Sequence, residues 1–178
     1  ATDSYRLAVR ELVATADGRT VPAAGVFTRN LMTAAPVRVT REHLQCDAGA
    51  AAAVVLNSGN ANACTGEEGL SAVRMTSDAA CAALGLPRNS LLVSSTGVMG
   101  VPLPASMIAA ALPRLCAALS VLGIAGAGDA ILTTDAYPKR GVRKISVRGG
   151  RVTLGGIAKG AGMIAPNMGT MLAYVFTD

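Results

Sequence analysis

The residue pair with the most distinctive chemistry is Gly169-Thr170, near the end of the 178-residue sequence. Gly169 can take backbone angles that a residue with a Cβ resists. The Thr170 hydroxyl could therefore attack the carbonyl carbon before it, convert the peptide bond to an ester and, after hydrolysis, leave Thr170 with a free α-amino group. Such a threonine holds a nucleophile and, with an α-amino pKa of roughly 7.7 to 8, its own general base. The alternative is an ordinary junction between a loop and a strand, because Gly-Thr is a common dipeptide.

The stretch around this pair begins as a glycine-rich loop, Lys159 to Gly162, and then passes two turn residues, Pro166 and Asn167. It ends in the apolar run 171–176, which predicts a short buried strand. Lys159 lies between glycines and only eleven residues before Thr170. That position favours a contact with substrate over a solvated lysine side chain.

A group of asparagines follows the apolar run 50–56, which predicts a strand. Asn57, Asn60 and Asn62 crowd amide donors and acceptors at the carboxyl end of that strand, where open α/β sheets tend to bind ligands. Asparagine and glycine also favour plain turns, so a turn explains this segment equally well.

A second polar segment, 94–100, follows the predicted strand 91–93. Backbone N–H groups in a glycine-containing turn can bind an anion, such as the tetrahedral oxyanion of an acyl transfer. A plain turn is the alternative. A nucleotide-phosphate loop fits poorly, because no GxxxxGK[ST] pattern occurs there.

Five stretches in the same order resemble the ornithine acetyltransferase family, the glutamate N-acetyltransferases of arginine biosynthesis. They are Ala24-Gly-Val-Phe-Thr-Arg-Asn30 with Ala34-Ala-Pro-Val37, Asn57-Ser-Gly-Asn-Ala-Asn-Ala-Cys-Thr-Gly66, Ser95-Thr-Gly-Val98, Thr133-Thr-Asp135, and the run from Lys159 to Leu172. Each stretch alone is weakly specific, whereas five in register are specific. Together they span nearly the whole chain.

The resemblance implies an α/β fold, a layered α-β-β-α-type sandwich of the N-terminal-nucleophile-like kind. It implies a self-cleavage between Gly169 and Thr170, so that residues 1–169 form an α chain and residues 170–178 begin a β chain. The remainder of that β chain, which is absent from this sequence, would complete the fold. The family usually assembles as α2β2.

The resemblance also implies a reaction and a set of site residues. An acetyl group passes from N-acetylornithine to Thr170 and then to glutamate, with acetyl-CoA as a further donor in some members and with no metal or other cofactor. Thr96 and Gly97 stabilise the oxyanion. Thr133, Lys159 and Thr170 contact the substrate, and Thr134 and Asp135 are their neighbours.

Three other functions remain open from the residues themselves. The first is a hydrolase in which an N-terminal threonine transfers the acyl group to water. The second is a non-catalytic binding domain in which the Gly169-Thr170 bond stays intact. The third is a nucleic-acid binder, suggested by the net charge of +5.

The charge distribution argues against nucleic acid as the partner. Lysine and arginine gather in the segment 139–151, which is predicted as a hairpin because two strand-like runs flank Gly149-Gly150. Aromatic residues make up only 3% of the chain, so the segment lacks side chains on which bases could stack. A solvated hairpin face is therefore favoured, and its positive charge could attract an acidic substrate such as glutamate.

Composition bounds the rest of the interpretation. The length suits one domain, and 51% hydrophobic residues with no tryptophan predict a core of small aliphatic side chains. Four cysteines without CxxC spacing and one histidine make no zinc site. Such cysteines are expected as buried thiols in a reducing compartment, the cytoplasm. No apolar run is long enough to predict a membrane span.

The expected elements follow from hydrophobic periodicity and turn signals. Strands are expected at 5–13, 21–27, 50–56, 91–93, 142–147, 151–154 and 171–176, and helices at 40–44, 67–84 and 104–119. The first two strands should pair around Asp17-Gly18, and Thr40 should cap a short helix that carries a surface His43.

Capping and breaking residues set the other expected boundaries. Thr65 and Glu68 fit a capping box, and Gly85 should end the helix that follows. Pro113 should break or kink the next helix. Residues 123–128 are expected as a connector, with Asp129 capping a turn at 130–132.

Overall fold

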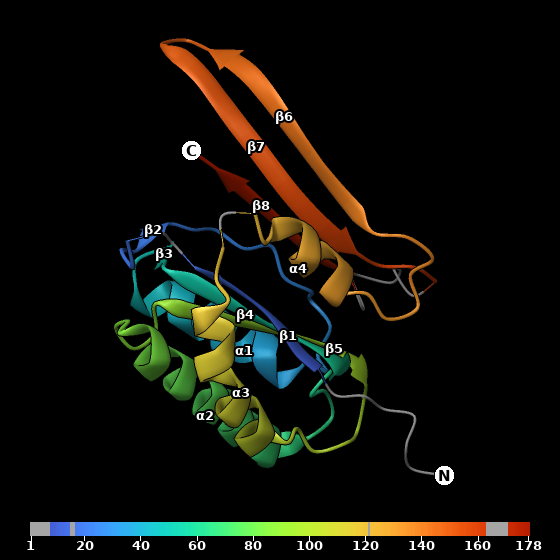
Figure 1. The fold of residues 1–178 in the computed structure, drawn as a ribbon. Helices are drawn as coiled ribbons and strands as arrows, with labels where there is room; N and C mark the ends of the chain where they lie inside the picture. Colours follow the sequence, from blue (N-terminus) through green and yellow to red (C-terminus); the bar gives the residue numbers. More distant parts are fainter. Residues whose placement is uncertain (1–7, 15–16, 121, 163–170) are drawn as a thin grey trace.

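The computed structural model of the chain describes residues 8–14, 17–120, 122–162 and 171–178, with the backbone alone for residues 8–13. Figure 1 shows the arrangement of the elements. The strands are β1 (Ala8–Ala14), β2 (Val21–Pro22), β3 (Ala50–Ala51), β4 (Ala53–Asn60), β5 (Leu91–Val98), β6 (Lys139–Val147), β7 (Gly150–Lys159) and β8 (Leu172–Thr177). The helices are α1 (Ala35–Cys46), α2 (Gly66–Leu84), α3 (Ala105–Ala117) and α4 (Ile124–Ala130).

The central sheet has the strand order β1-β4-β5. β1 is antiparallel to β4, whereas β4 and β5 are parallel and are connected through α2. Val55 pairs with Val93 and Ser58 pairs with Thr96. Both strands therefore change from apolar to polar residues toward the same carboxyl end of the sheet.

One face of the central sheet packs against α1, α2 and α3 (Figure 1). α2 forms because Leu70, Val73 and Ala80 recur at helical spacing and bury one side of the helix. Gly85, with φ of 66°, ends it in the left-handed conformation that glycine takes most readily. The buried cluster on this face consists of Ala35, Val39, Ala53, Val55, Leu70, Val73, Ala80, Cys81, Leu91, Val93 and Leu112.

The other face of the central sheet meets α4 and a second sheet with the order β6-β7-β8 (Figure 1). A buried cluster there contains Leu56 of β4, Ile157 of β7 and Ile131, which directly follows α4. Tyr174 of β8 packs against this cluster. Beyond this contact, the β6–β7 hairpin projects from the body (Figure 1). Helices, central sheet and second sheet are thus successive layers, which confirms the predicted layered α/β fold.

Several predicted strands are confirmed with different limits or partners. The basic hairpin is confirmed and longer than expected, and every residue of β6 after Lys139 is exposed, as predicted for a solvated face. β5 continues from Val93 to Val98 because its polar half stays paired with β4. The run 50–56 is divided at Ala52, whose N–H bonds to the Ser90 carbonyl at 2.6 Å.

Two predictions about strand surroundings are wrong. The segment 21–27 is not the hairpin partner of β1, because β1 pairs with the long apolar β4 and only Val21–Pro22 forms a strand, with β3. The run 171–176 does form a strand, but β8 is not buried. Its side chains alternate, and Val175 is 73% exposed.

The helix boundaries also differ from the prediction. α1 begins at Ala35, not at Thr40, with Pro36 in its first turn. Thr65 makes no side-chain cap for α2, so the capping box is wrong; its hydroxyl donates to Asn62 Oδ1 instead. Pro113 lies on the exposed side of α3 and the helix continues to Ala117.

The predicted connector 123–128 is wrong, because α4 occupies Ile124–Ala130 and Asp129 lies inside it. Its small residues allow a close approach to β7. A Cβ on Gly128 would lie 3.3 Å from Ile157 Cγ2. Packing against the second sheet therefore stabilises a helix that its glycines would disfavour.

His43 is not a surface residue. It is 7% exposed, and its Nδ1 lies 2.7 Å from the Leu91 carbonyl oxygen at the outer edge of β5. The cysteine prediction holds only in part. All four cysteines are unpaired, and Cys81 is buried, but Cys46 and Cys64 are exposed. The division of the chain at residues 169 and 170 remains a prediction, because that junction lies outside the described residues.

Candidate active site

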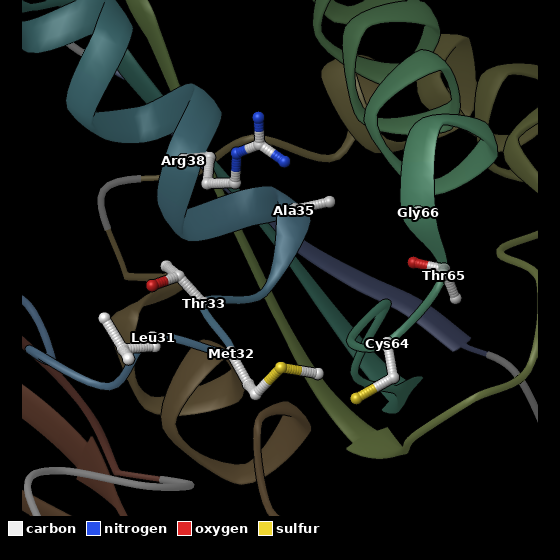
Figure 2. A pocket seen from close by; sticks show the side chains of 8 residues that line it. All are labelled: Leu31, Met32, Thr33, Ala35, Arg38, Cys64, Thr65 and Gly66. Atoms are coloured by element: carbon white, nitrogen blue, oxygen red, sulfur yellow. The ribbon is translucent and has the colours of Figure 1, made fainter.

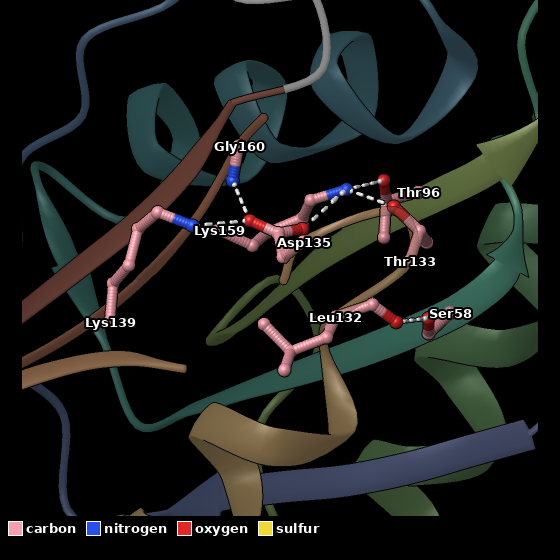
Figure 3. A network of polar contacts seen from close by, with 8 residues as sticks. All are labelled: Ser58, Thr96, Leu132, Thr133, Asp135, Lys139, Lys159 and Gly160. Atoms are coloured by element: carbon pink, nitrogen blue, oxygen red, sulfur yellow. Dashed lines mark hydrogen bonds and ion pairs between the residues drawn. The ribbon is translucent and has the colours of Figure 1, made fainter. Parts of the chain in front are cut away.

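The candidate site is centred on Lys159, the last residue of β7. Lys159 is 2% exposed although it carries a charge. Its Nζ donates to Thr96 Oγ1 of β5 at 2.9 Å and to Thr133 Oγ1 at 2.6 Å. Figure 3 shows the ammonium group reaching both hydroxyls. Three segments far apart in the sequence thus converge on one amine.

Asp135 supplies the negative charge of this cluster. Its side chain is fully buried, and its Oδ1 accepts hydrogen bonds from Lys139 Nζ at 2.6 Å and from the Gly160 N–H at 2.8 Å. Its Oδ2 lies 3.9 Å from Lys159 Nζ. The carboxylate thereby connects the start of β6, the end of β7 and the loop after α4 (Figure 3).

The ionisation of the two central groups follows from these contacts. Burial lowers the pKa of Lys159; the charge of Asp135 opposes this shift and the charge of Lys139 adds to it. Burial acts to raise the pKa of Asp135, but the hydrogen bonds from Lys139 and Gly160 outweigh it and lower that pKa. Two cations and one anion share the site, so it is suited to bind or stabilise an additional negative charge.

Gly97, next to Thr96, lies close to the backbone of Gly59 in the neighbouring strand β4. Its φ is 135°, and a Cβ at this position would lie 2.3 Å from the carbonyl carbon of Gly59. Only glycine fits there without moving backbone. The Thr96-Gly97 pair therefore belongs to a distorted end of the β4–β5 ladder, not to a turn after the strand as predicted.

The asparagines after residue 56 have structural roles. Asn60 Nδ2 donates to the carbonyls of Val101 and Pro102 at 3.1 and 3.2 Å. Asn62, fully buried, donates to the Gly69 carbonyl at 2.9 Å. These amides fix loops at the carboxyl end of the sheet, which favours the structural explanation of the segment for Asn60 and Asn62.

Asn57 differs from the other two asparagines in one respect. Its Nδ2 donates to the Asn60 carbonyl and to Ser95 Oγ, but its Oδ1 is buried and has no hydrogen-bond partner in the described part of the chain. A group with an N–H or O–H could satisfy that oxygen.

The structure brings together Thr96, Thr133 and Lys159, three of the residues singled out in the sequence. Thr134 is exposed, and within the described residues it has no hydrogen bond or ion pair with the cluster. The other candidates, Gly169 and Thr170, lie outside the described residues. The roles assigned to all of them stay predictions.

Sequence reasoning missed the contacts of Asp135 and Lys139. Asp135 was expected only as a neighbour of Thr133, and Lys139 only as part of a basic surface. A weak signal existed, because a carboxylate and a lysine four residues apart can form an ion pair. No local sequence pattern indicated that Lys159 and Gly160, more than twenty residues later, would contact the same carboxylate.

A separate pocket of about 370 Å³ lies between the first turns of α1 and α2 (Figure 2). Arg38 is the charged residue among those that line it, and Leu31 and Met32 give it an apolar side. The backbone N–H groups of Val37 and Arg38, which could have bound an anion there, are bonded to the Ala34 carbonyl. This pocket shares no residue with the Lys159 cluster.

Two kinds of feature are absent from the described residues. No three histidine, cysteine, aspartate or glutamate side chains in these ranges gather closely enough to hold a metal ion. No helix among the described elements is long and apolar enough to cross a membrane.

Comparison with known proteins gives concordant results. The model of the ArgJ family matches residues 5–178. The arginine biosynthesis bifunctional protein ArgJ of Symbiobacterium thermophilum is 49% identical over 156 residues, covering 88% of this chain and 38% of the relative. The same-named protein of Rhizobium meliloti is 48% identical over 160 residues, covering 90% and 38%. The chain therefore spans about two fifths of the length of these curated relatives.

Two solved structures share the fold at 38% identity and a TM-score of 0.75. One is the arginine biosynthesis bifunctional protein of Bacillus halodurans, with 84% of this chain and 78% of that chain covered. The other is the ornithine acetyltransferase of Mycobacterium tuberculosis in complex with ornithine, with 88% and 81% covered.

Proposed function

The chain belongs to the ArgJ family, and we propose that it forms the greater part of the site of an acetyltransferase that moves an acetyl group from N-acetylornithine to glutamate. The observation that carries this proposal is the buried Lys159 ammonium bonded to Thr96 and Thr133. A buried cation surrounded by hydroxyl groups suits a reaction in which negative charge develops on a carbonyl oxygen. The curated relatives act in arginine biosynthesis, as their names state.

The proposed reaction is a double displacement at Thr170. After cleavage of the Gly169-Thr170 bond, the hydroxyl oxygen attacks the acetyl carbonyl and the α-amino group accepts its proton. The new C–O bond replaces the C–N bond to ornithine, which leaves with that proton. The amine of glutamate then attacks the acetyl-threonine ester and restores the hydroxyl. Acetyl-CoA is a second acetyl donor in this proposal, and no metal or other cofactor takes part.

Thr96 and Gly97 are the proposed oxyanion donors. One such donor is typically worth about 10²- to 10³-fold in rate, since it is already oriented before the charge appears. The close approach of Gly97 to Gly59 supports this assignment, because the lack of a Cβ at Gly97 lets two backbones pass close together beside Thr96. Lys159 and Thr133 are proposed to contact the substrate.

The proposed assembly contains a second polypeptide, cut from the same precursor, in an α2β2 complex. The second sheet supports this proposal. Its outer face, on the side away from Ile157, carries apolar side chains along all three strands: Ile145, Val147, Val152, Leu154 and Val175. An exposed apolar face of this kind usually marks an interface.

The proposed compartment is the cytoplasm, because unpaired cysteines fit a place where thiols stay reduced.

The test is the intact mass, under denaturing conditions, of the protein expressed from its complete gene. We expect two fragments divided between Gly169 and Thr170, and an added acetyl group on the second fragment after incubation with N-acetylornithine. Glutamate should remove that group and yield N-acetylglutamate. A T170A variant, which lacks the hydroxyl, should stay uncut.

Two outcomes would contradict the proposal. A single uncut wild-type chain would leave Thr170 without a free amine and favour a binding domain. Release of acetate at the same rate with and without glutamate would identify a hydrolase, in which water is the acceptor.

A further inference from the structure

The contacts of Lys159 restrict the direction in which the Thr96 hydroxyl can donate. An ammonium group has three N–H donors and accepts no hydrogen bond, so Thr96 Oγ1 must be the acceptor of its 2.9 Å contact with Lys159. The hydrogen of Thr96 then points away from the amine. No acceptor for this hydrogen is recorded within the described residues, so it is available to a ligand.

The amine itself is held in place from the opposite side by Asp135. The distance of 3.9 Å between Lys159 Nζ and Asp135 Oδ2 is an ion pair, not a hydrogen bond. That oxygen is buried and has no hydrogen-bond partner in the described ranges, and the Lys159 amine is the cation that faces it. Lys139 and the Gly160 N–H hold the other carboxylate oxygen and thus fix the orientation of the group.

We propose that Asp135 and Lys159 form a positioning pair that sets the direction of the Thr96 O–H bond, so that this hydroxyl donates to the oxyanion. The inference rests on the proposed function and names a task within it. Lys159 acts through Thr96, and Asp135 acts through Lys159 (Figure 3). A contact of the third N–H of Lys159 with the substrate is compatible with this task.

Kinetics separate positioning from substrate binding alone. A lysine that only binds substrate contributes equally to the ground state and the transition state, so its loss raises KM and leaves kcat unchanged. A lysine that orients an oxyanion donor contributes mainly in the transition state, so its loss lowers kcat. Two residues that act through one hydrogen bond also show non-additive losses.

The test is a double-mutant cycle on the full-length protein with the variants T96V, K159M and T96V/K159M. Denaturing mass spectrometry gives the cleaved fraction, and rates are expressed per cleaved molecule. We expect T96V to lower kcat about 100-fold. K159M should lower kcat by no more than T96V does, and the double variant should lie within about twofold of T96V. T96S, which keeps the hydroxyl, should retain most of the activity.

Other results would overturn the inference. If K159M raises KM alone, or if the two losses multiply in the double variant, Lys159 does not act through Thr96, while the proposed function still stands. If the wild-type protein transfers no acetyl group, the proposed function fails, and the inference fails with it.

Asp135 is tested by the pH dependence of kcat, because the described charged groups that face Lys159 are Asp135 and Lys139. Asp135 raises the pKa of Lys159, so D135N should lower that pKa and let the amine lose its proton at lower pH. The alkaline limb of the kcat profile should move to lower pH.

The control D129N removes a half-exposed carboxylate that pairs with Arg140 at 3.5 Å and should leave the alkaline limb in place. An equal loss of activity at every pH in D135N would reduce Asp135 to a structural role and overturn its part of the inference.

Discussion

At the scale of single residues, the site depends on a few buried polar side chains and on Gly97, where the surrounding backbone leaves no room for a side chain. Lys159 is buried because two hydroxyls and a carboxylate replace its hydration. Gly97 lies against Gly59 in a conformation that L-residues with a Cβ rarely adopt. These two positions are the ones at which substitution should be least tolerated.

Gly97→Ala should destabilise the protein more than an alanine substitution in open space. Its Cβ would lie 2.3 to 2.6 Å from backbone atoms of Gly59 and Asn60, and its φ of 135° adds strain. We expect a loss of at least about 2 kcal/mol, seen as a lower thermal midpoint at equal protein concentration.

Gly155→Ala is the matched control, because a Cβ on this glycine of β7 meets nothing within 4 Å. Its effect should stay within about 0.5 kcal/mol. Equal midpoints for the two variants would show that β4 and β5 can separate at Gly97 without cost.

Tyr174→Phe should remove a sensitivity to high pH. The buried hydroxyl makes no well-aligned hydrogen bond with a described residue, although Ser94 lies near it. Burial raises the pKa of Tyr174 well above its usual value near 10. A raised folded-state pKa of an acid means that this contribution to stability is complete below pH 10 and is lost as the pH rises above it.

The measurement is the thermal midpoint between pH 8 and pH 11 for both proteins. The wild-type midpoint should fall more steeply above pH 10 than that of Tyr174→Phe, while at pH 8 the variant should be equally stable or slightly more stable. A parallel decline in the two proteins would show that the Tyr174 hydroxyl is not the group responsible.

At the scale of elements, α1 does more than cover the central sheet. β5 is one of the two edge strands in the order β1-β4-β5, and an edge strand has unpaired backbone groups. Thr40 Oγ1 donates to the Val93 carbonyl at 2.7 Å and accepts from the Val93 N–H at 3.0 Å. His43, one turn later, reaches the Leu91 carbonyl. Two side chains of α1 therefore replace the missing neighbouring strand along the segment that leads to Thr96.

Thr40→Val should measure this edge pairing. Valine keeps the shape of threonine but leaves both backbone groups of Val93 buried without a partner. We expect a loss of about 1–3 kcal/mol, measured as a lower denaturation midpoint.

Thr76→Val is the matched control within α2. Its hydroxyl is also buried, but it only adds a second bond to the Ala72 carbonyl four residues earlier, which already accepts the helical N–H. That variant should remain within about 0.5 kcal/mol of wild type. Comparable losses in the two variants would mean that the edge of β5 is not specially dependent on Thr40.

At the scale of the whole molecule, the two sheets have opposite surroundings. The central sheet is covered on both faces, by the helices and by the second sheet. The second sheet uses only its inner face, through Ile157 and Tyr174, in the described structure. The outer face of the second sheet, which carries the exposed Val175, is the surface on which the proposed second polypeptide would pack.

Val175→Asp should weaken the association of the two proposed polypeptides. Val175 is 73% exposed on the outer face of β8, and a carboxylate buried there without a partner would be costly. We expect the cleaved full-length protein to shift toward separate chains in size-exclusion chromatography with light scattering.

Thr177→Asp changes a polar residue on the same face of the same strand and should shift the equilibrium much less. If both variants assemble like the wild type, the outer face of the second sheet is not the interface.

Local sequence patterns determined much of this protein. Alternating and helical periodicities predicted the long α2, the strands β4, β5, β7 and β8, and the basic hairpin around Gly149-Gly150. The resemblance of five stretches to one family predicts that Thr96, Thr133 and Lys159 belong to one site. These features are predictable because they depend on residues close in sequence, whose preferences persist in the fold.

Only the tertiary structure decided what these residues contact. Lys159 and Thr96 are 63 residues apart, and their hydrogen bond depends on the packing of β7 against the central sheet. The same holds for the burial of His43 against β5 and for the helix at 124–130, which forms despite its glycines because it packs against Ile157. Such contacts depend on which surfaces face each other, and hydrophobic spacing along the chain does not specify the partner of a polar atom.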